Sequence, residues 1–141
     1  MDKLLIVSAN QGKWFNQYLN EFADTGLDVT VNFRSGRKVQ EIDSAIVEQT
    51  CSFTDVVLHL GTNNIPDRFD SPPIIVKRMH DLVGRILMVN PTCRIHITSI
   101  LPRQRNDFQY GTERQRQSRD YQRHMDFIDF CNSKVNCIIL R

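Results

Sequence analysis

The sequence predicts an α/β fold, a three-layer α/β/α sandwich built on a five-stranded parallel sheet with strand order 2-1-3-4-5. Short apolar or β-branched runs alternate along the chain with amphipathic helical patterns, which is typical of parallel sheets covered by helices. One run, Val56–Leu60, is apolar except for His59 and stops at Gly61-Thr62-Asn63-Asn64. Such a run is typical of a buried strand that ends at the edge of a sheet.

The apolar runs place the five strands in order along the chain. They are residues 3–8, 28–33, 54–60, 94–98 and 136–140. Right-handed crossovers between successive strands give the flavodoxin-like arrangement, with the first strand at the centre. In open α/β sheets, ligands bind beyond the carboxyl ends of the strands, so the polar turn at 61–64 predicts a functional site. The same asparagines are also compatible with a simple chain turn.

Helical periodicity fills the intervals between the strands. The expected apolar faces are Phe15, Tyr18, Leu19 and Phe22; Val39, Ile42 and Ile46; Ile75, Met79, Leu82, Val83 and Ile86; and Tyr121, Met125 and Ile128. The third of these helices has the clearest boundaries. Ser71 is a predicted N-cap, two prolines follow it in the first turn, and Asn90-Pro91 ends the helix.

The length, charge and cysteines restrict the class of protein. A chain of 141 residues with a formal charge of +2 predicts a single domain over residues 1–141, with no global bias towards nucleic acid or membrane. The first residues lack the longer apolar region of a signal peptide, so we expect an intracellular protein, cytoplasmic rather than secreted. No Cys-x-x-Cys pair occurs, which favours free thiols over a zinc site, and we expect no cofactor. The four cysteines are Cys51, Cys93, Cys131 and Cys137.

Glycine and asparagine motifs at the expected strand ends resemble those of the SGNH (GDSL-type) hydrolases. Gly36 matches the glycine of the second family block, and Gly61-Thr62-Asn63-Asn64 matches the third. The segment 94–103 is similar to the family's fourth strand, so the likeness covers nearly the whole chain. The resemblance implies an oxyanion-type pocket formed by Asn10, Gly36 and Asn63.

Two departures from the family pattern bear on catalysis. Leu5-Ile6-Val7-Ser8-Ala9-Asn10 aligns with the block that ends in Gly-Asp-Ser, so Asn10 stands at the nucleophile position. An amide side chain cannot be activated as an alkoxide. The sequence also reaches Arg141 where the Asp-x-x-His block should begin, as expected of a domain truncated after its fifth strand. No catalytic residue is therefore expected.

Three functional hypotheses follow. The first is a non-catalytic binding module that keeps the hydrolase fold. The second is a serine esterase for acyl or acetyl esters, with Ser8 or Ser35 as a relocated nucleophile and a histidine such as His124 as the base. The histidines, however, fall on predicted strands and helix faces rather than on the loop facing Ser8. The third pairs His59 and His96 on a metal, although strand histidines are more often simply hydrogen-bonded.

An arginine-rich stretch is a candidate contact for RNA or single-stranded nucleic acid. Residues 103–123 hold six arginines and three carboxylates, with Phe108, Tyr110 and Tyr121 interleaved, a mixture suited to phosphates and stacked bases. The alternative is that these charged residues form an ordinary solvent-exposed helix face. The predicted contacts are Arg34, Arg37, Lys38, Arg103, Arg105, Arg114, Arg116 and Arg119. The chain is also expected to bind a protein partner or to associate with itself through the edge strand at Ile138-Ile139-Leu140. We expect no membrane contact.

Overall fold

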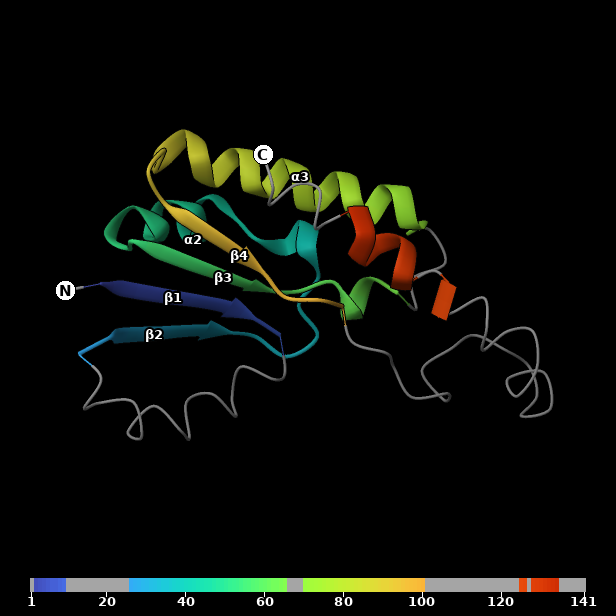
Figure 1. The fold of residues 1–141 in the computed structure, drawn as a ribbon, viewed down its shortest axis with the longest axis horizontal. Coiled ribbons are helices and arrows are strands. Elements are labelled where there is room, and N and C mark those ends of the chain that lie inside the picture. Colours follow the sequence, from blue (N-terminus) through green and yellow to red (C-terminus); the bar gives the residue numbers. More distant parts are fainter. Residues whose placement is uncertain (1, 10–25, 66–69, 101–124, 127, 135–141) are drawn as a thin grey trace.

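The computed structural model describes residues 2–9, 26–65, 70–100, 125–126 and 128–134. Within them lies a four-stranded parallel sheet of order β2-β1-β3-β4 (Figure 1). The strands are β1 (Lys3–Ser8), β2 (Asp28–Phe33), β3 (Asp55–His59) and β4 (Arg94–Ile97). The predicted α/β class, parallel sheet and order of the first four strands are confirmed. The sheet has four described strands where five were predicted, because the expected strand 136–140 lies outside the described residues.

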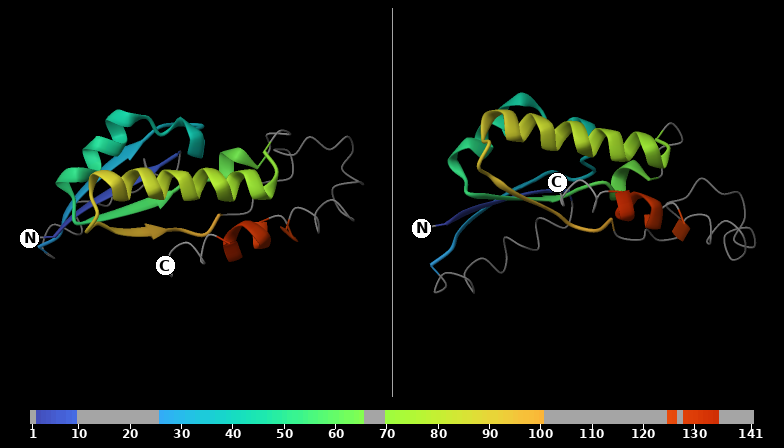
Figure 2. Two further views of the ribbon diagram at one scale, coloured as in Figure 1. Left: turned by 90° about the horizontal axis from the view of Figure 1, so that it is seen from above. Right: turned by 45° about the horizontal axis from the view of Figure 1, so that its top comes forward.

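One face of the sheet forms the main core. Leu5 and Val7 of β1 alternate with half-buried neighbours and lie in register with Val56 and Leu58 of β3, and all four are at most 1% exposed. Alternate residues of a strand point to the same face, so these side chains form one apolar layer. That layer packs against two helices, α2 (Ser44–Gln49) and α3 (Pro72–Val89), which lie on the same side of the sheet (Figure 2).

Helix α3 is the longest described helix and follows the sequence prediction closely. It begins after the predicted N-cap, Ser71, has proline at its first two positions, and ends at Asn90. Four of its five predicted apolar residues are buried, and Val83 is half-buried. The buried four are Ile75, Met79, Leu82 and Ile86. Among the described residues, no helix is long and apolar enough to cross a membrane.

The helix predicted around Val39, Ile42 and Ile46 is divided in two. A 3-10 turn, η2 (Val39–Glu41), ends where Ile42 is extended, and α2 begins after Asp43. The Asp43 carboxylate accepts a hydrogen bond from the backbone N–H of Ile46 (3.0 Å). This N-cap starts a new helix, and so breaks the single predicted one.

A second, smaller core lies beside the amino end of α3. Ile75 packs with Ile100, Ile128 and Cys131, all at most 4% exposed. Residues 128–134 are helical, which agrees with the predicted apolar face of the fourth helix. The described cysteines are free thiols, of which Cys93 and Cys131 are buried and Cys51 is exposed. The predicted helix at 14–22 lies outside the described residues.

Candidate functional site

Segments that are distant in the sequence meet at the carboxyl edge of the sheet. The backbone N–H of Arg34, just after β2, donates to the carbonyl of Ser8 at the end of β1 (3.2 Å). Asn63 lies in η4 (Thr62–Asn64), which follows β3, and its side-chain amide donates to the carbonyl of Arg37 (3.1 Å). The turn that contains Gly36 therefore lies against both β1 and η4, while the pocket that Gly36 and Asn63 would share with Asn10 stays a prediction.

Glycine is needed where the chain turns at this edge. Gly61, after β3, has φ +112°, a conformation that side-chain-bearing residues rarely adopt. A Cβ there would also lie 3.0 Å from two side-chain carbons of Ile100. Gly36 has φ +74° in the turn closed by the hydrogen bond from Arg37 N–H to the carbonyl of Arg34 (3.2 Å). The sequence signal at both positions is therefore a backbone requirement.

Arg37 is a buried cation at this edge, only 5% exposed. Its Nη1 donates to the carbonyls of Ser8 (3.4 Å) and Asn32 (3.2 Å) and to the side-chain oxygen of Asn32 (3.1 Å). Burial, and then the nearby charge of Arg34, lowers the pKa of Arg37 from its ordinary value. That value lies so far above neutrality that we treat the guanidinium as charged. Among the described residues it has no ion-pair partner, and Nε is enclosed without a hydrogen bond.

A second buried polar group, behind Asn63, is fully paired. Asn64 is 0% exposed, and its side-chain oxygen accepts from the backbone N–H of Val39 (3.1 Å). Its amide nitrogen donates to Gln40 (2.7 Å) and to the carboxylate of Asp70 (3.0 Å). Asp70, 3% exposed, also pairs with Arg78 of α3. This network fastens η2, η4 and the start of α3 together.

Ser8 and His59 are neighbours across the sheet. They are register partners in β1 and β3, so both side chains belong to the same face. His59 lies on a strand, as predicted, and its register with Ser8 could not be read from periodicity. Ser8 is 0% exposed, and its hydroxyl donates to the carbonyl of Ala9 (3.3 Å). Asn10, at the position of the family nucleophile, lies outside the described residues.

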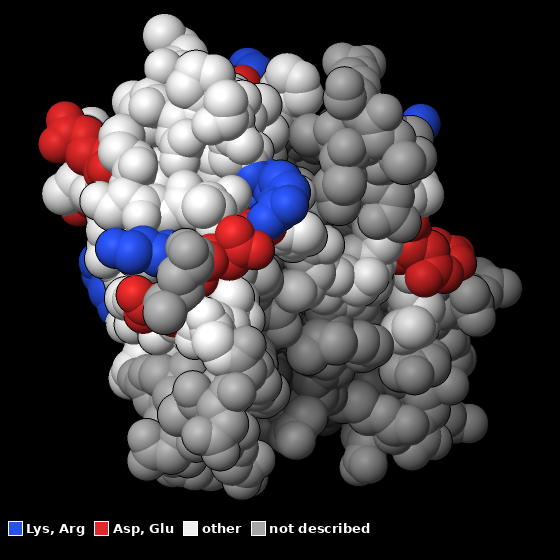
Figure 3. Space-filling model, turned by 60° about the vertical axis from the view of Figure 1, so that its left-hand side comes forward, with Lys and Arg blue, Asp and Glu red and all other residues white. Residues whose placement is uncertain are grey.

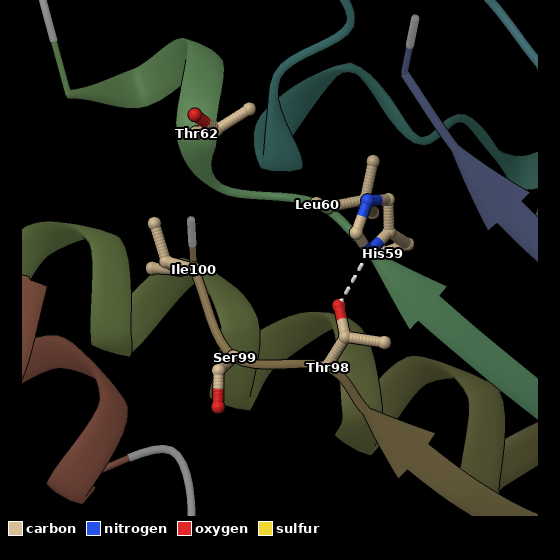
Figure 4. A pocket seen from close by; sticks show the side chains of 6 residues that line it. All are labelled: His59, Leu60, Thr62, Thr98, Ser99 and Ile100. Carbon is tan, nitrogen blue, oxygen red and sulfur yellow. Dashed lines mark hydrogen bonds between the residues drawn. The ribbon is translucent and has the colours of Figure 1, made fainter. Parts of the chain in front are cut away.

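His59 also lines a small pocket between the carboxyl ends of β3 and β4 (Figure 4). Its Nδ1 lies 2.7 Å from the hydroxyl of Thr98, and that hydroxyl is 3.4 Å from the carbonyl of Leu58. Which of the two atoms donates in the Nδ1–Thr98 pair depends on the tautomer of the ring. Burial lowers the pKa of His59, so the ring is neutral at pH 7. The other lining residues are Leu60, Thr62, Ser99 and Ile100.

The predicted nucleic-acid contacts divide into two groups. Arg34 is exposed, with 63% of its side chain accessible, and pairs with Glu41 at 3.4 Å. Lys38 is half-buried, and Arg37 is buried as described above. The remaining five, Arg103, Arg105, Arg114, Arg116 and Arg119, lie outside the described residues, as do His124 and the predicted edge strand. Contact with nucleic acid stays a prediction.

A charged cluster lies at the opposite, amino end of the strands. Asp55 of β3 accepts from the Nε of Arg94 (2.8 Å), its Nη2 (2.9 Å) and the hydroxyl of Thr54 (3.0 Å), and pairs with His96 at 3.1 Å. Hydrogen bonds from Arg94, and then from His96, hold the pKa of Asp55 well below its usual value. In Figure 3, which brings the left-hand side of Figure 1 forward, basic and acidic atoms touch on this end.

The suggested histidine metal pair has other partners. His96 bonds to Asp55 and His59 to Thr98. His96 is in register with Val57, so the two histidines lie at different levels of the sheet. Within the part of the chain that the structure describes, no three histidine, cysteine or acidic residues cluster as metal ligands do.

Sequence reasoning missed Asp70, Arg78 and Thr98. Asp70 lies just before the N-cap Ser71, a place where a solvent-exposed carboxylate is the ordinary expectation. The signal that could have found it is Arg78 eight residues later, on the first turns of α3. Thr98 could have been paired with His59 by extending the parallel register of β3 and β4 by one residue.

Comparisons with known proteins agree with this geometry at the level of the fold. No family model matches the sequence. No curated protein matches it either. Solved structures do: the psychrotrophic esterase EstA from Pseudoalteromonas sp. superposes with a TM-score of 0.67 at 14% identity, over 98% of this chain and 72% of the esterase.

Two further structures show the same likeness. An acetyl esterase superposes with a TM-score of 0.66 at 13% identity, over 99% of this chain and 73% of its own. A GDSL-like lipase from Bacteroides thetaiotaomicron gives 0.62 at 14% identity, over 96% of this chain and 62% of the lipase. Sequence identities this low support a shared fold and nothing beyond it. The chain has the fold of the SGNH, or GDSL-type, esterases and lipases.

Proposed function

We propose that this chain is a non-catalytic binding module that uses the fold of the SGNH hydrolases without their ester chemistry. The observation that carries the proposal is Ser8, whose side chain is fully buried and whose hydroxyl donates to the backbone. A serine in that position is not presented to an ester. The motif alignment adds support, since it gives the nucleophile position to Asn10, and an amide cannot form an acyl-enzyme.

The ligand we propose is RNA or single-stranded nucleic acid. The support is the mixture of arginines and aromatic residues at 103–123, together with the basic turn 34–38 after β2. Guanidinium groups bind phosphates through paired hydrogen bonds, and aromatic rings stack on bases of any sequence. Loops that follow β2 and β4 leave the same edge of a parallel sheet. These two basic segments are therefore candidates for one continuous surface.

The salt dependence of binding tests this ligand. Each phosphate contact releases counterions, so affinity for a single-stranded oligonucleotide should fall with salt at a slope of roughly −0.7 per contact. A triple variant, Arg114→Ala with Arg116→Ala and Arg119→Ala, should bind much more weakly than wild type. The matched control, Lys3→Ala with Lys13→Ala and Lys77→Ala, removes the same charge elsewhere and should bind nearly as well.

Two outcomes would contradict the nucleic-acid proposal. Equal losses in the two triple variants would mean nonspecific attraction by charge. No binding at low salt would remove nucleic acid altogether and leave a protein-binding module, for which the predicted edge strand at 138–140 is the first surface to test.

A serine esterase with Ser8 as nucleophile is the second candidate. Its support is the register of Ser8 with His59, a neutral histidine held by Thr98, because a base oriented by a third group is the arrangement that activates serine. Hydrolysis of p-nitrophenyl acetate decides between the candidates. We expect any hydrolysis by wild type to persist in Ser8→Ala, so that none of it depends on Ser8. Turnover lost in both Ser8→Ala and His59→Gln, with folding intact, would establish the esterase.

A further inference from the structure

The guanidinium of Arg37 uses only one of its three nitrogens. All of its hydrogen bonds to the described residues come from Nη1, which reaches Ser8 and Asn32. Nε is enclosed and has no hydrogen-bond partner. The Nε–Nη2 edge is therefore unpartnered. This is the edge at which two parallel N–H groups match two oxygens of a phosphate or carboxylate.

Among the described residues, no carboxylate bonds to that edge. The acidic residues whose charge acts on Arg37 are Asp43 and Glu41. Asp43 caps α2 through Ile46, and Glu41 accepts from the backbone N–H of Lys38 (2.9 Å) and pairs with Arg34. Buried charges in proteins are normally paired. A cation that is 95% buried, beside a second arginine and without a carboxylate partner among the described residues, favours binding of an external anion.

We propose that the Nε–Nη2 edge of Arg37 is a binding site for a phosphate-type oxyanion. The site lies at the carboxyl edge of the sheet, where open α/β sheets bind their ligands. It deepens the proposed function, on which it rests for the source of the phosphate, a nucleic-acid backbone. Because Nε is enclosed, binding of the anion requires a local movement that opens this edge.

Titration of inorganic phosphate into the 141-residue chain tests the site. Wild type should bind phosphate, and Arg37→Met should weaken binding about tenfold or more, the loss expected for paired charge-assisted hydrogen bonds. Arg37→Lys keeps the charge without the planar fork and should bind only slightly better than the methionine variant. The control, Lys77→Met, removes an exposed positive charge from α3, outside the proposed surface, and should change the affinity by less than about threefold.

A measurement on the wild-type chain covers the case in which Arg37→Met does not fold. In ¹⁵N NMR spectra, the Nε–H signal of Arg37 should shift on addition of phosphate and saturate with the binding isotherm. An Nε–H signal unchanged at saturating phosphate, no binding by wild type, or equal binding by Arg37→Met would each overturn the proposal.

An oligonucleotide distinguishes failure of this site from failure of the proposed function. If the oligonucleotide binds wild type and Arg37→Met equally well, the site at Arg37 is refuted and the nucleic-acid module stands. If phosphate shifts the Nε–H signal while the oligonucleotide does not bind, the anion site stands and the nucleic-acid function is refuted. Competition between phosphate and oligonucleotide supports both.

Discussion

The two ends of the sheet treat their charged residues differently. At the carboxyl edge, Arg37, Asn64 and Asp70 are at most 5% exposed. At the amino end, Arg94 pairs with Asp55 while 62% of its side chain stays accessible. Exposed pairs cost little to form, whereas a buried charge must recover its lost hydration from protein partners.

This difference shows that the carboxyl edge, unlike the amino end, is held by buried polar groups. Asp70 recovers its hydration through Arg78 and Asn64, and this pairing holds three segments in place. Arg37 recovers only part of its lost hydration, through the hydrogen bonds of Nη1. We conclude that the Asp70 network is structural, whereas the Arg37 edge is the part of the molecule for which we propose a ligand.

The largest effect should come from Asp70→Ala. It leaves Arg78 without its carboxylate and Asn64 without one acceptor, and should lower the free energy of unfolding by about 2–4 kcal/mol, somewhat below a wholly buried pair because Arg78 is one-third exposed. Urea unfolding measures the loss. The control, Asp81→Ala, removes an exposed carboxylate from α3 and should cost less than about 0.5 kcal/mol. Equal losses would contradict the structural role of the network.

Gly61→Ala should come next. Its φ of +112° and the close approach of Ile100 predict a loss of about 1–3 kcal/mol in the free energy of unfolding. The variant Gly84→Ala is the matched control, because Gly84 lies in α3 with open space around it. Alanine there should stabilise the chain slightly. A Gly61→Ala protein as stable as wild type would mean that the edge is not rigid.

Because of His59, we expect the free energy of unfolding to depend moderately on pH. Burial lowers its pKa, so the folded state favours the neutral ring. Stability from this group is complete above the pKa of an unfolded histidine, about 6.5, and is lost as the pH falls through the lower folded value. Urea unfolding between neutral pH and about pH 5 should show this loss, and His59→Gln should flatten it. An NMR titration of the His59 ring that gave a raised pKa would contradict its burial.

The smallest effect should come from the amino end. The lowered pKa of Asp55 means that its contribution is complete above the usual carboxyl pKa of about 3.9 and is lost as the pH falls towards the folded value. Because Arg94 and His96 are largely exposed, Asp55→Asn should lower the melting temperature at neutral pH by a few degrees at most. A loss as large as that of Asp70→Ala would erase the contrast between the two ends.

Local sequence signals were enough for the parts of the fold that depend on local chemistry. The bounds of β1 and β2 match the apolar runs at 3–8 and 28–33, and the prolines after Ser71 begin α3 as predicted. The break before Asp43 was missed, because the spacing of Val39, Ile42 and Ile46 fits one helix until the cap is considered.

The parts of the site that depend on strand pairing could not be predicted in this way. The sequence predicts Arg37 as one of several nucleic-acid contacts, and its burial follows only when β1 and β2 end side by side. The meeting of Ser8 with His59 likewise depends on the register of two strands that are about fifty residues apart. The positions of Gly36 and Asn63 at one edge were predictable, because parallel strands end at the same side.

The most direct test of the central claim is mass spectrometry of the chain after incubation with a fluorophosphonate, a reagent that labels activated serines. The account predicts no adduct on Ser8, since its hydroxyl is buried and bonded to the carbonyl of Ala9. A stoichiometric adduct on Ser8, absent from His59→Gln, would contradict the non-catalytic proposal and show that the fold has kept its hydrolase chemistry with a displaced nucleophile.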